Sequence, residues 1–382
     1  MQLHAFVRSL LRSGQLFILG FTVAIFLASP MLEPVSAQSP QRTIRTIAGD
    51  GAVDKARDLG PAREMSLSNP FGVQPLADGS LIIASFDQHV LYRLDRSFGR
   101  LERIAGMGKA GLSGTGGEHP TDVALNQPHE VQVDDQGNIY VADTTNHRIG
   151  KIDAQTGRWS VVAGTGAAGF SGDKGPAVEA QLDQAYSLAV YDQDLYVADL
   201  GNRRIRHVDL RSGMIQTICG TGEAGIPSDG GRATDQPLAG PRSLAVDSSN
   251  LWIVLREGNS VWRMGRRDGK IYRVAGSGGK GRIGDGGDAR MAQFNGPKGI
   301  AVDPDVALYI ADTENHAIRR VDLKSGRIST AVGTSDGQGG FNGDGDQLNQ
   351  RQLNRPHGVC LLPGGGLVIG DSENHRLRLC EP

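Results

Sequence analysis

Residues 139–153 read IYVADTTNHRIGKID, and similar stretches occur at residues 308–322 (LYIADTENHAIRRVD) and 367–381 (LVIGDSENHRLRLCE). In each copy a short apolar run ends at an aspartate, a polar turn with Asn and His follows, and a second short run begins. Short runs rich in β-branched and aromatic residues on both sides of a polar turn are typical of a β-hairpin. The stretch therefore predicts a hairpin that the chain uses repeatedly.

The whole chain repeats with the period of this hairpin. Two apolar residues followed by glycine close each period, and these glycines are Gly49, Gly106, Gly164, Gly220, Gly276 and Gly333. They are 57, 58, 56, 56 and 57 residues apart, and each full period holds a glycine-rich connector and four β-type runs. A fixed period of this length indicates one repeat architecture. Six radial sheets of four antiparallel strands make an all-β, six-bladed β-propeller.

The two ends of the repeat are complementary. The repeat begins with a run of the fourth type, residues 43–49, and finishes after a run of the third type, residues 376–380. The last blade thus lacks its outer strand. We predict that the N-terminal strand supplies it, which closes the ring and removes an exposed sheet edge.

Composition agrees with this fold and excludes one class of function. Glycine supplies 54 of the 382 residues, about twice the usual share of ~7%, which suits a chain with many turns. The 40 Lys and Arg residues nearly balance 42 Asp and Glu. A nucleic-acid binder commonly carries a basic excess, so we expect no nucleic-acid partner.

Residues 1–37 are expected to be a signal peptide. Arg8 and Arg12 precede an apolar run over residues 16–28, and Val35-Ser36-Ala37 supplies a small-residue cleavage site. The run is shorter than the ~18 residues of a spanning helix; an uncleaved anchor is the alternative. We therefore expect one propeller domain over residues 38–382, secreted or periplasmic, monomeric, and without stable membrane insertion after cleavage.

The cysteines allow two interpretations. The chain has an odd number of cysteines, three, and their spacing is not that of a metal site; they are Cys219, Cys360 and Cys380. They are either three small buried side chains or include one Cys360–Cys380 disulfide.

The repeated hairpin resembles the NHL repeat, on residues 142–149, 311–318 and 370–377. Connector residues 169–177 and 284–287 are similar to those of exported bacterial NHL proteins and of the teneurin propeller. The resemblance covers residues ~43 to 382, although Ser85 and Leu255 replace the aspartate in blades 1 and 4. It implies the propeller fold and leaves the activity open, because common folds host many functions.

Polar residues that recur in several blades are expected to be structural. They would satisfy their own turn and bridge to the next blade; they are Asp143, Asp199, Asp312, Asp371, His147, His316 and His375. Connector motifs such as Asp285-Gly286-Gly287 lack the ligand spacing of an EF-hand calcium loop. Turn and capping roles are therefore preferred for them.

Positions that differ between blades are better candidates for function. The second residue of the inner run reads Phe71, His129, Tyr186, Arg242, Lys298 and His357, and the next position holds Glu130 in blade 2. Strand parity brings these residues, the polar turns and the connectors to one mouth of the central channel. The turn of blade 4 adds Arg256 and Glu257. Converging polar groups in a concave place predict a binding site made of all nine residues.

Arg242, Lys298 and Arg256 favour a carboxylate or phosphate ligand. We therefore expect an exported protein that binds a small anionic ligand or an unknown protein partner at the channel mouth, without catalysis or cofactor.

A second resemblance gives the alternative. The peptide-amidating lyase is also an NHL-like propeller, whose zinc is held by three histidines in Pro-His-x-aliphatic runs. Residues 128–131 and 356–359 match that run, and Arg242 stands in the third place. The resemblance implies zinc on His129 and His357. The alternative is therefore a lyase or hydrolase that uses these two histidines, with or without a metal, and Tyr186 as its acid/base; calcium at the channel mouth is the other metal left open.

Overall fold

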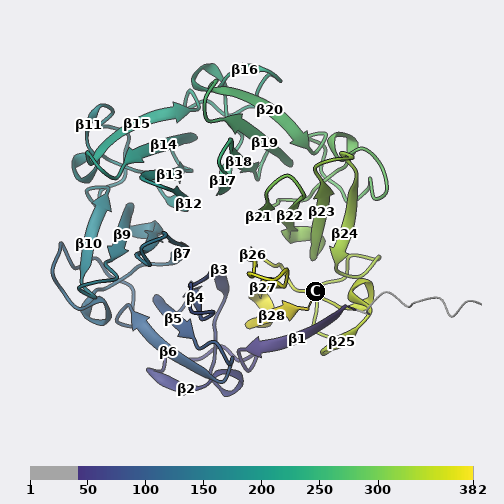
Figure 1. Cartoon of the computed structure of the whole chain (residues 1–382), viewed down its shortest axis with the longest axis horizontal. Helices are drawn as coiled ribbons and strands as arrows, with labels where there is room; N and C mark the ends of the chain where they lie inside the picture. The colour runs from purple at the N-terminus through teal and green to yellow at the C-terminus, as the bar shows by residue number, and fades with distance from the viewer. Residues whose placement is uncertain (1–41, 382) are drawn as a thin grey trace, which may run out of the picture. The chain divides into compact units, whose positions relative to one another are not determined.

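The computed structural model describes residues 42–381, so the predicted signal peptide lies outside the described residues. Six antiparallel sheets surround a central axis (Figure 1). The predicted all-β, six-bladed propeller is confirmed. Within the described residues no helix has the length and apolar character needed to cross a membrane.

Each blade has an inner, a second, a third and an outer strand. The inner strands are β3 (Pro70–Pro75), β7 (Pro128–Val133), β12 (Ala185–Tyr191), β17 (Pro241–Val246), β21 (Gly299–Asp303) and β26 (Val359–Leu361). The second strands are β4 (Leu81–Ser85), β8 (Ile139–Asp143), β13 (Asp194–Asp199), β18 (Asn250–Leu255), β22 (Ala307–Asp312) and β27 (Leu367–Asp371). The third strands are β5 (Val90–Leu94), β9 (Arg148–Ile152), β14 (Arg204–Asp209), β19 (Ser260–Gly265), β23 (Ala317–Asp322) and β28 (Arg376–Cys380). The outer strands are β6 (Arg100–Ala105), β10 (Trp159–Ala163), β15 (Met214–Cys219), β20 (Lys270–Ala275), β24 (Ile328–Val332) and β1 (Thr43–Ala48).

The ring closes as predicted. Strand β1 pairs antiparallel with β28, with Ile44 opposite Cys380 and Thr46 opposite Arg378. Figure 1 shows the purple β1 beside the yellow strands of the last blade. The first and last segments of the repeat therefore share one sheet.

Four blades carry a fifth strand that the four-strand prediction did not include. Each is a short connector segment that pairs with the outer strand of the blade it enters; they are β2 (Leu59–Pro61), β11 (Gly175–Pro176), β16 (Gly231–Arg232) and β25 (Gly345–Asp346). In the other two blades an isolated β-bridge replaces the fifth strand; these bridges join Gly116 to Ser160 and Asp288 to Arg327. The connectors thus cover outer edges that would otherwise expose unpaired backbone groups.

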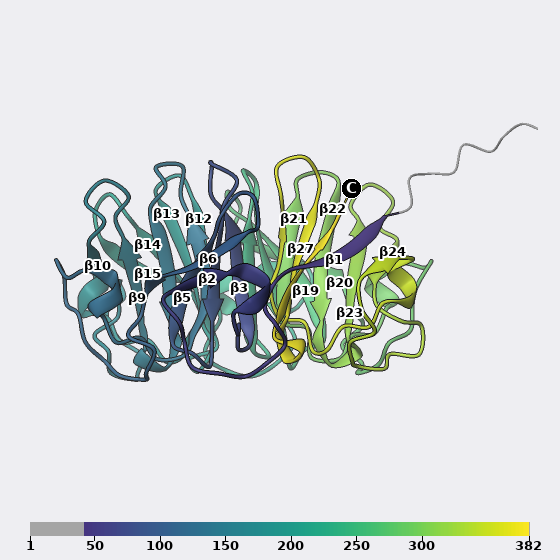
Figure 2. The same cartoon turned by 90° about the horizontal axis from the view of Figure 1, so that it is seen from below.

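The helical segments are single 3-10 turns. Those in the connectors are η1 (Ala62–Glu64), η2 (Pro120–Asp122), η4 (Ala177–Glu179), η5 (Ala233–Asp235), η6 (Ala289–Met291) and η8 (Leu348–Gln350). Those in the complete NHL turns, between second and third strands, are η3 (Thr144–Asn146), η7 (Thr313–Asn315) and η9 (Ser372–Asn374). The side view in Figure 2 shows the β12–β13 and β21–β22 loops projecting on one side of the ring, which we call the hairpin face. The opposite side, where the inner strands begin and the NHL turns lie, is the connector face.

The core lies between neighbouring blades. One cluster, for example, joins Ile82 and Ala84 of blade 1 to Val131 and Trp159 of blade 2. Cys219, Cys360 and Cys380 are buried and free, and no disulfide joins them in the described part of the chain. The three-buried-residue interpretation is therefore the one that the structure supports.

The inner strands approach one another closely. A Cβ atom at Gly299 would lie 1.9 Å from the His357 carbonyl oxygen, and one at Gly358 would lie 1.7 Å from that of Phe71. Only glycine allows these approaches, so the two glycines let neighbouring inner strands pack tightly side by side.

Candidate functional site

The repeated aspartates organise the turns on the connector face. Asp143 accepts hydrogen bonds from the Asn126 backbone N–H at 2.7 Å, from Asn146 Nδ2 at 2.8 Å and from Arg148 Nε at 2.8 Å. The backbone and asparagine bonds recur at Asp199, Asp312 and Asp371. These buried carboxylates hold their own blade together, in agreement with the structural interpretation.

The repeated histidines join neighbouring blades. The Nδ1 atoms of His147, His316 and His375 accept backbone N–H groups from the next blade at 3.1, 3.1 and 3.2 Å. His89 makes the same contact with Gln127 at 3.0 Å, although blade 1 lacks the aspartate. The hydrogen bonds that these histidines accept therefore hold the ring together.

Connector carboxylates are engaged in the same framework. Asp285 accepts from Arg319 Nη2 at 2.6 Å and from Thr330 Oγ1 at 2.7 Å. Asp344 accepts from the Thr46 backbone N–H at 2.9 Å and pairs with Arg378 at 3.3 Å. These contacts favour the structural role over calcium binding.

The variable residues of the inner strands form a packed ring around the axis, which we call the channel ring: Phe71, His129, Tyr186, Arg242, Lys298 and His357. Phe71 stacks on His357 with ring centroids 4.0 Å apart, and His129 lies 4.8 Å from Phe71 and 4.9 Å from Tyr186. Arg242 lies over the Tyr186 ring, with its Cζ atom 3.7 Å from the ring centroid. The structure thus brings these side chains together into one continuous arc.

Arg242 is the unusual member of the ring. It is only 4% exposed, and its Nε and Nη1 atoms have no hydrogen-bond partner among residues 42–381. Burial lowers the pKa of Arg242 to about 9, and the positive charge of Arg256 acts in the same direction. Tyr186, Glu257 and Glu130 act in the opposite direction and raise this pKa. The guanidinium is therefore still cationic near neutral pH, held by a cation–π contact and short of acceptors.

The other predicted cations already have partners. Lys298 Nζ donates to Glu314 at 2.8 Å, and Arg355 joins Glu314 at 2.8 Å and also pairs with Glu373. Arg256 pairs with Glu257 on the rim. Burial lowers the pKa of Lys298 to about 8, although Glu314 opposes the shift. Charge in the ring therefore balances everywhere except at Arg242. Sequence reasoning missed Arg355, because an arginine directly before the proline of an inner strand does not by itself indicate a functional role.

Glu130 lies one residue past the ring, where the five other blades have glycine or serine in place of a long side chain. Burial raises its pKa to about 8, while the Val131 N–H and the Arg242 charge act in the opposite direction. The Glu130 charge also acts on Cys360. A Cβ atom at Gly72 would lie 2.6 Å from Glu130 Oε1, so the Glu130 carboxyl lies against the neighbouring inner strand β3, close enough to Arg242 to feel its charge.

His129 and His357 are close, but their surroundings suit a metal poorly. Their ring centroids are 6.2 Å apart, and His357 Nδ1 contacts the Arg355 carbonyl at 2.9 Å. Burial lowers both pKa values well below the ordinary range, helped by the charges of Arg242 and Lys298. No cluster of three His, Cys, Asp or Glu ligands exists within residues 42–381. Two imidazoles beside a guanidinium and an ammonium do not fit a cation that usually takes three protein ligands.

The central channel continues from the ring toward the hairpin face as a cavity of about 180 Å³. All six inner strands line it, mostly with apolar side chains: Ala189, Val190, Leu244, Ala245, Val246, Ile300, Ala301, Val302, Val359, Cys360 and Leu361. Gln74 and Gln132 form the polar part of the lining. These residues lie two to four positions beyond the ring along the same strands, and no ring residue is among those that line the cavity.

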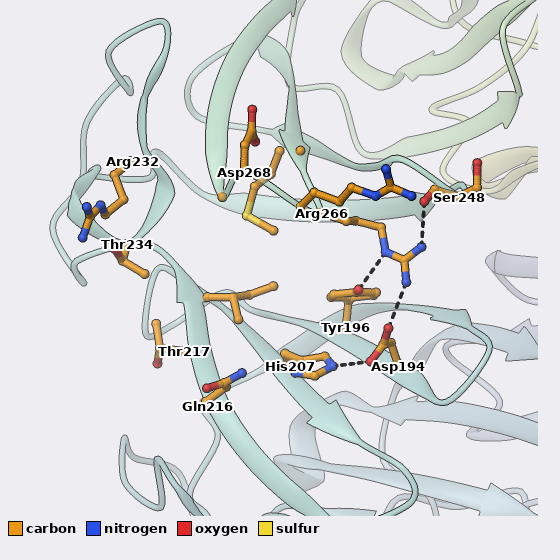
Figure 3. A pocket seen from close by; sticks show the side chains of 15 residues that line it. Asp194, Tyr196, His207, Gln216, Thr217, Arg232, Thr234, Ser248, Arg266 and Asp268 are labelled. Atoms are coloured by element: carbon orange, nitrogen blue, oxygen red, sulfur yellow. Dashed lines mark hydrogen bonds and ion pairs between the residues drawn. The ribbon is translucent and has the colours of Figure 1, made fainter.

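A larger cavity of about 800 Å³ lies between blades 3 and 4 (Figure 3). Asp194 accepts from His207 Nε2 at 2.7 Å and from Arg266 Nη2 at 2.9 Å, and Arg266 Nε donates to the Tyr196 hydroxyl at 3.0 Å. Sequence reasoning missed this cluster, because Asp194 and Arg266 are 72 residues apart and meet only through blade packing. Arg266 Nη1 also donates to the Asp247 and Ser248 carbonyls. The cluster is therefore a satisfied bridge between blades, unlike Arg242.

Proteins of known identity share stretches of this sequence. NHL repeat-containing protein 2 from Gallus gallus is 27% identical over 292 residues, which are 67% of this chain and 38% of that protein. The chain thus spans less than half the length of that relative. SUPPRESSOR OF QUENCHING 1 from Arabidopsis thaliana is 32% identical over 197 residues, 49% of this chain and 18% of that protein.

Solved structures share the fold. A Bacteroides thetaiotaomicron protein of unknown function aligns over 89% of this chain and 75% of its own, with a TM-score of 0.66 and 18% identity. An auxiliary nutrient binding protein from the same species aligns over 89% and 76%, with a TM-score of 0.64 and 15% identity. At these identities the likeness concerns the fold alone.

Two family models match the repeats themselves. The teneurin NHL domain matches residues 110–209 and 273–340, and the NHL repeat matches residues 353–378. Together these matches cover about half of the chain and include all three complete copies of the hairpin. The chain belongs to the NHL-repeat family of β-propellers.

Proposed function

We propose that this chain is an exported binding protein that holds a small anionic ligand, with a carboxylate or phosphate group, on Arg242 in the channel ring. The observation that carries the proposal is a buried guanidinium whose Nε and Nη1 have no partner among the described residues. A buried charge without a partner is costly. An anion on one edge of the guanidinium would accept from one of these nitrogens together with Nη2, which is the bidentate geometry that arginine offers.

The surrounding charges favour a ligand with one negative charge. Lys298 is paired with Glu314, and Arg256 is paired with Glu257. Arg355 pairs with Glu314 and Glu373 and balances the second carboxylate. Arg242 is therefore the charge left over, and a single negative charge on the ligand matches it.

The proposal is tested by titrating the purified protein with acetate and with phosphate, followed by ligand-observed NMR. We expect saturable binding of one anion that Arg242→Met abolishes. Arg256→Met serves as the matched control, since it removes a cation that already has a partner. Binding that survives in Arg242→Met, or no binding of either anion, would contradict the proposal.

The metal-assisted lyase or hydrolase is the less favoured alternative, because the charges around His129 and His357 disfavour a cation. Metal analysis of the purified protein checks this directly. One zinc or calcium ion per chain, lost in the His129→Ala and His357→Ala double variant, would favour the enzyme. Export is checked separately by comparing fractions of cells that express the chain with and without residues 1–37.

A further inference from the structure

We infer that the cavity between blades 3 and 4 is a second binding site, which takes a sugar carrying a carboxylate, such as a uronic acid (Figure 3). This cavity of about 800 Å³ is independent of the channel ring, because none of the six ring residues lines it. The inference comes from the way in which it differs from the equivalent cavity one blade earlier.

The equivalent cavity, between blades 2 and 3, measures only about 240 Å³. Matching lining residues of the two cavities are 56 residues apart, one period of the repeat: Tyr140 and Tyr196, Lys151 and His207, and Leu210 and Arg266. In the smaller cavity Lys151 already pairs with Asp153 at 3.1 Å. Small-molecule sites are commonly about 300–1,000 Å³, so of the two cavities the one between blades 3 and 4 has the size of a binding site.

The packing of the two blades fixes the hydrogen-bonding state of His207. Its Nε2 contacts one oxygen of Asp194 at 2.7 Å, and Arg266 holds the other oxygen at 2.9 Å. When Nε2 of the neutral imidazole donates to Asp194, Nδ1 is left as an acceptor. No group within residues 42–381 donates to Nδ1, and the side chain is 16% exposed where it lines the cavity. His207 therefore offers an oriented acceptor to a ligand hydroxyl.

Blade 4 and the connector that enters it supply cations to the same cavity. Arg267 is exposed, and its guanidinium forms no ion pair with any described residue. Arg232 is 77% exposed and reaches Asp235 only at 4.0 Å. Because guanidinium groups bind carboxylates in a bidentate geometry, Arg267 is the residue on which we place the ligand carboxylate.

The rest of the lining favours a ligand with several hydroxyl groups. Ile218 and Met264 are its only large aliphatic side chains. Its other polar side chains are Gln216, Thr217, Thr234, Ser248 and Asp268. Amide, hydroxyl and carboxylate groups both donate to and accept from hydroxyls, whereas an acid with an aliphatic chain would find little apolar surface. A sugar acid combines the carboxylate with the hydroxyls.

The experiment titrates the purified protein at pH 8 with glucuronate, galacturonate and glucose, followed by ligand-observed NMR. Cyclohexanecarboxylate is added as an acid with a ring but no hydroxyls. All titrations are repeated in Arg242→Met, which removes the channel site. A uronate should bind in both backgrounds, and more tightly than glucose or cyclohexanecarboxylate. A uronate disaccharide that binds more tightly than the monomer would identify a glycan chain as the source, and equal affinity would identify a free sugar acid.

Two variants locate the ligand. Arg267→Gln should weaken uronate binding about tenfold and leave glucose binding unchanged. Arg211→Gln is the matched control, since Arg211 occupies the same turn position in blade 3 and does not line the cavity. His207→Leu should weaken the binding of uronate and glucose alike, and Leu379 at the matching position of blade 6 shows that the fold accommodates leucine there.

The outcomes keep this site apart from the anion site on Arg242. If uronate binding disappears in Arg242→Met but persists in Arg267→Gln, the acid lies in the channel ring and the second site is wrong. Equal binding of glucose would contradict the carboxylate, and equal binding of cyclohexanecarboxylate would contradict the hydroxyls. If neither uronate binds in the Arg242→Met background, the inference fails, whether or not the channel ring holds an anion.

Discussion

Arg319 and Arg242 are both buried arginines, and their surroundings are opposite. Arg319 is 0% exposed and its Nη1 and Nη2 atoms reach Asp312 at 3.3 Å and Asp285 at 2.6 Å. Arg206 and Arg378 repeat this arrangement in blades 3 and 6. Arg242 is 4% exposed and contacts the Tyr186 ring instead of a carboxylate.

The difference separates framework from function within one residue type. The arginines that recur among the repeats have carboxylates that recur with them, and each of these arginines pairs with a buried aspartate of its own blade, although its Nε atom has no partner among residues 42–381. Arg242 occupies a position that changes from blade to blade, and no carboxylate pairs with it among the described residues. A buried charge that the fold leaves without acceptors is costly, and the proposed anion site rests on this observation.

The largest effect should come from removing a framework carboxylate. Asp312→Ala leaves Arg319 without its fully buried partner and Asn295 without an acceptor. Breaking a buried pair in this way costs about 3–5 kcal/mol, measured as the free energy of unfolding in denaturant. Asp285→Ala removes the half-exposed partner of the same arginine and should cost clearly less. Equal losses would show that the buried aspartate has no special role.

The same substitution at the two arginines should give effects of opposite sign. Arg319→Met leaves the buried Asp312 without its partner and should destabilise the protein. Arg242→Met instead replaces an unpartnered charge by an apolar side chain of similar length. Removing a buried charge that has no partner removes its desolvation cost, so Arg242→Met should leave the stability unchanged or raise it. Thermal unfolding of the two variants side by side checks this. A comparable loss in both would remove the distinction between the two kinds of arginine.

The smallest effect concerns the paired cation of the ring, Lys298. Burial opposes ionisation of Glu314, but hydrogen bonds from Arg355 and Lys298 outweigh it and lower its pKa to about 2. A carboxyl with a lowered pKa stabilises the fold above its ordinary pKa of about 4.5, and this contribution disappears as the pH falls toward 2. Since a third of the Glu314 side chain is exposed, solvent screening reduces the expected contribution to about 1 kcal/mol.

Glu314→Gln tests that pairing through the pH dependence of unfolding. The variant should be less stable than the parent at pH 7 and equal to it near pH 2. A difference that stays constant over this range would mean that the ion pair contributes nothing and that Lys298 is as free as Arg242.

The sequence predicted the fold because each blade is a local unit. The period of 56–58 residues, the strand–turn–strand pattern and the complementary ends were sufficient for six blades and for closure by residues 43–48. The short fifth strands escaped prediction, since Gly175-Pro176 and Gly231-Arg232 are two-residue segments without any β pattern. Their pairing depends on where the connector passes the outer strand.

For the candidate site, comparison of the repeats was enough to select the ring residues, because differences between copies within one chain stand out against a constant framework. It could not show that Lys298 and Arg256 have acidic partners while Arg242 lacks them. Nor could it show that Ala245, Ala301 and Cys360 turn toward one narrow cavity. Repeats determine local pairing, which depends on nearby residues. The charge balance and the shape of the channel depend on six strands that meet only when the ring is closed.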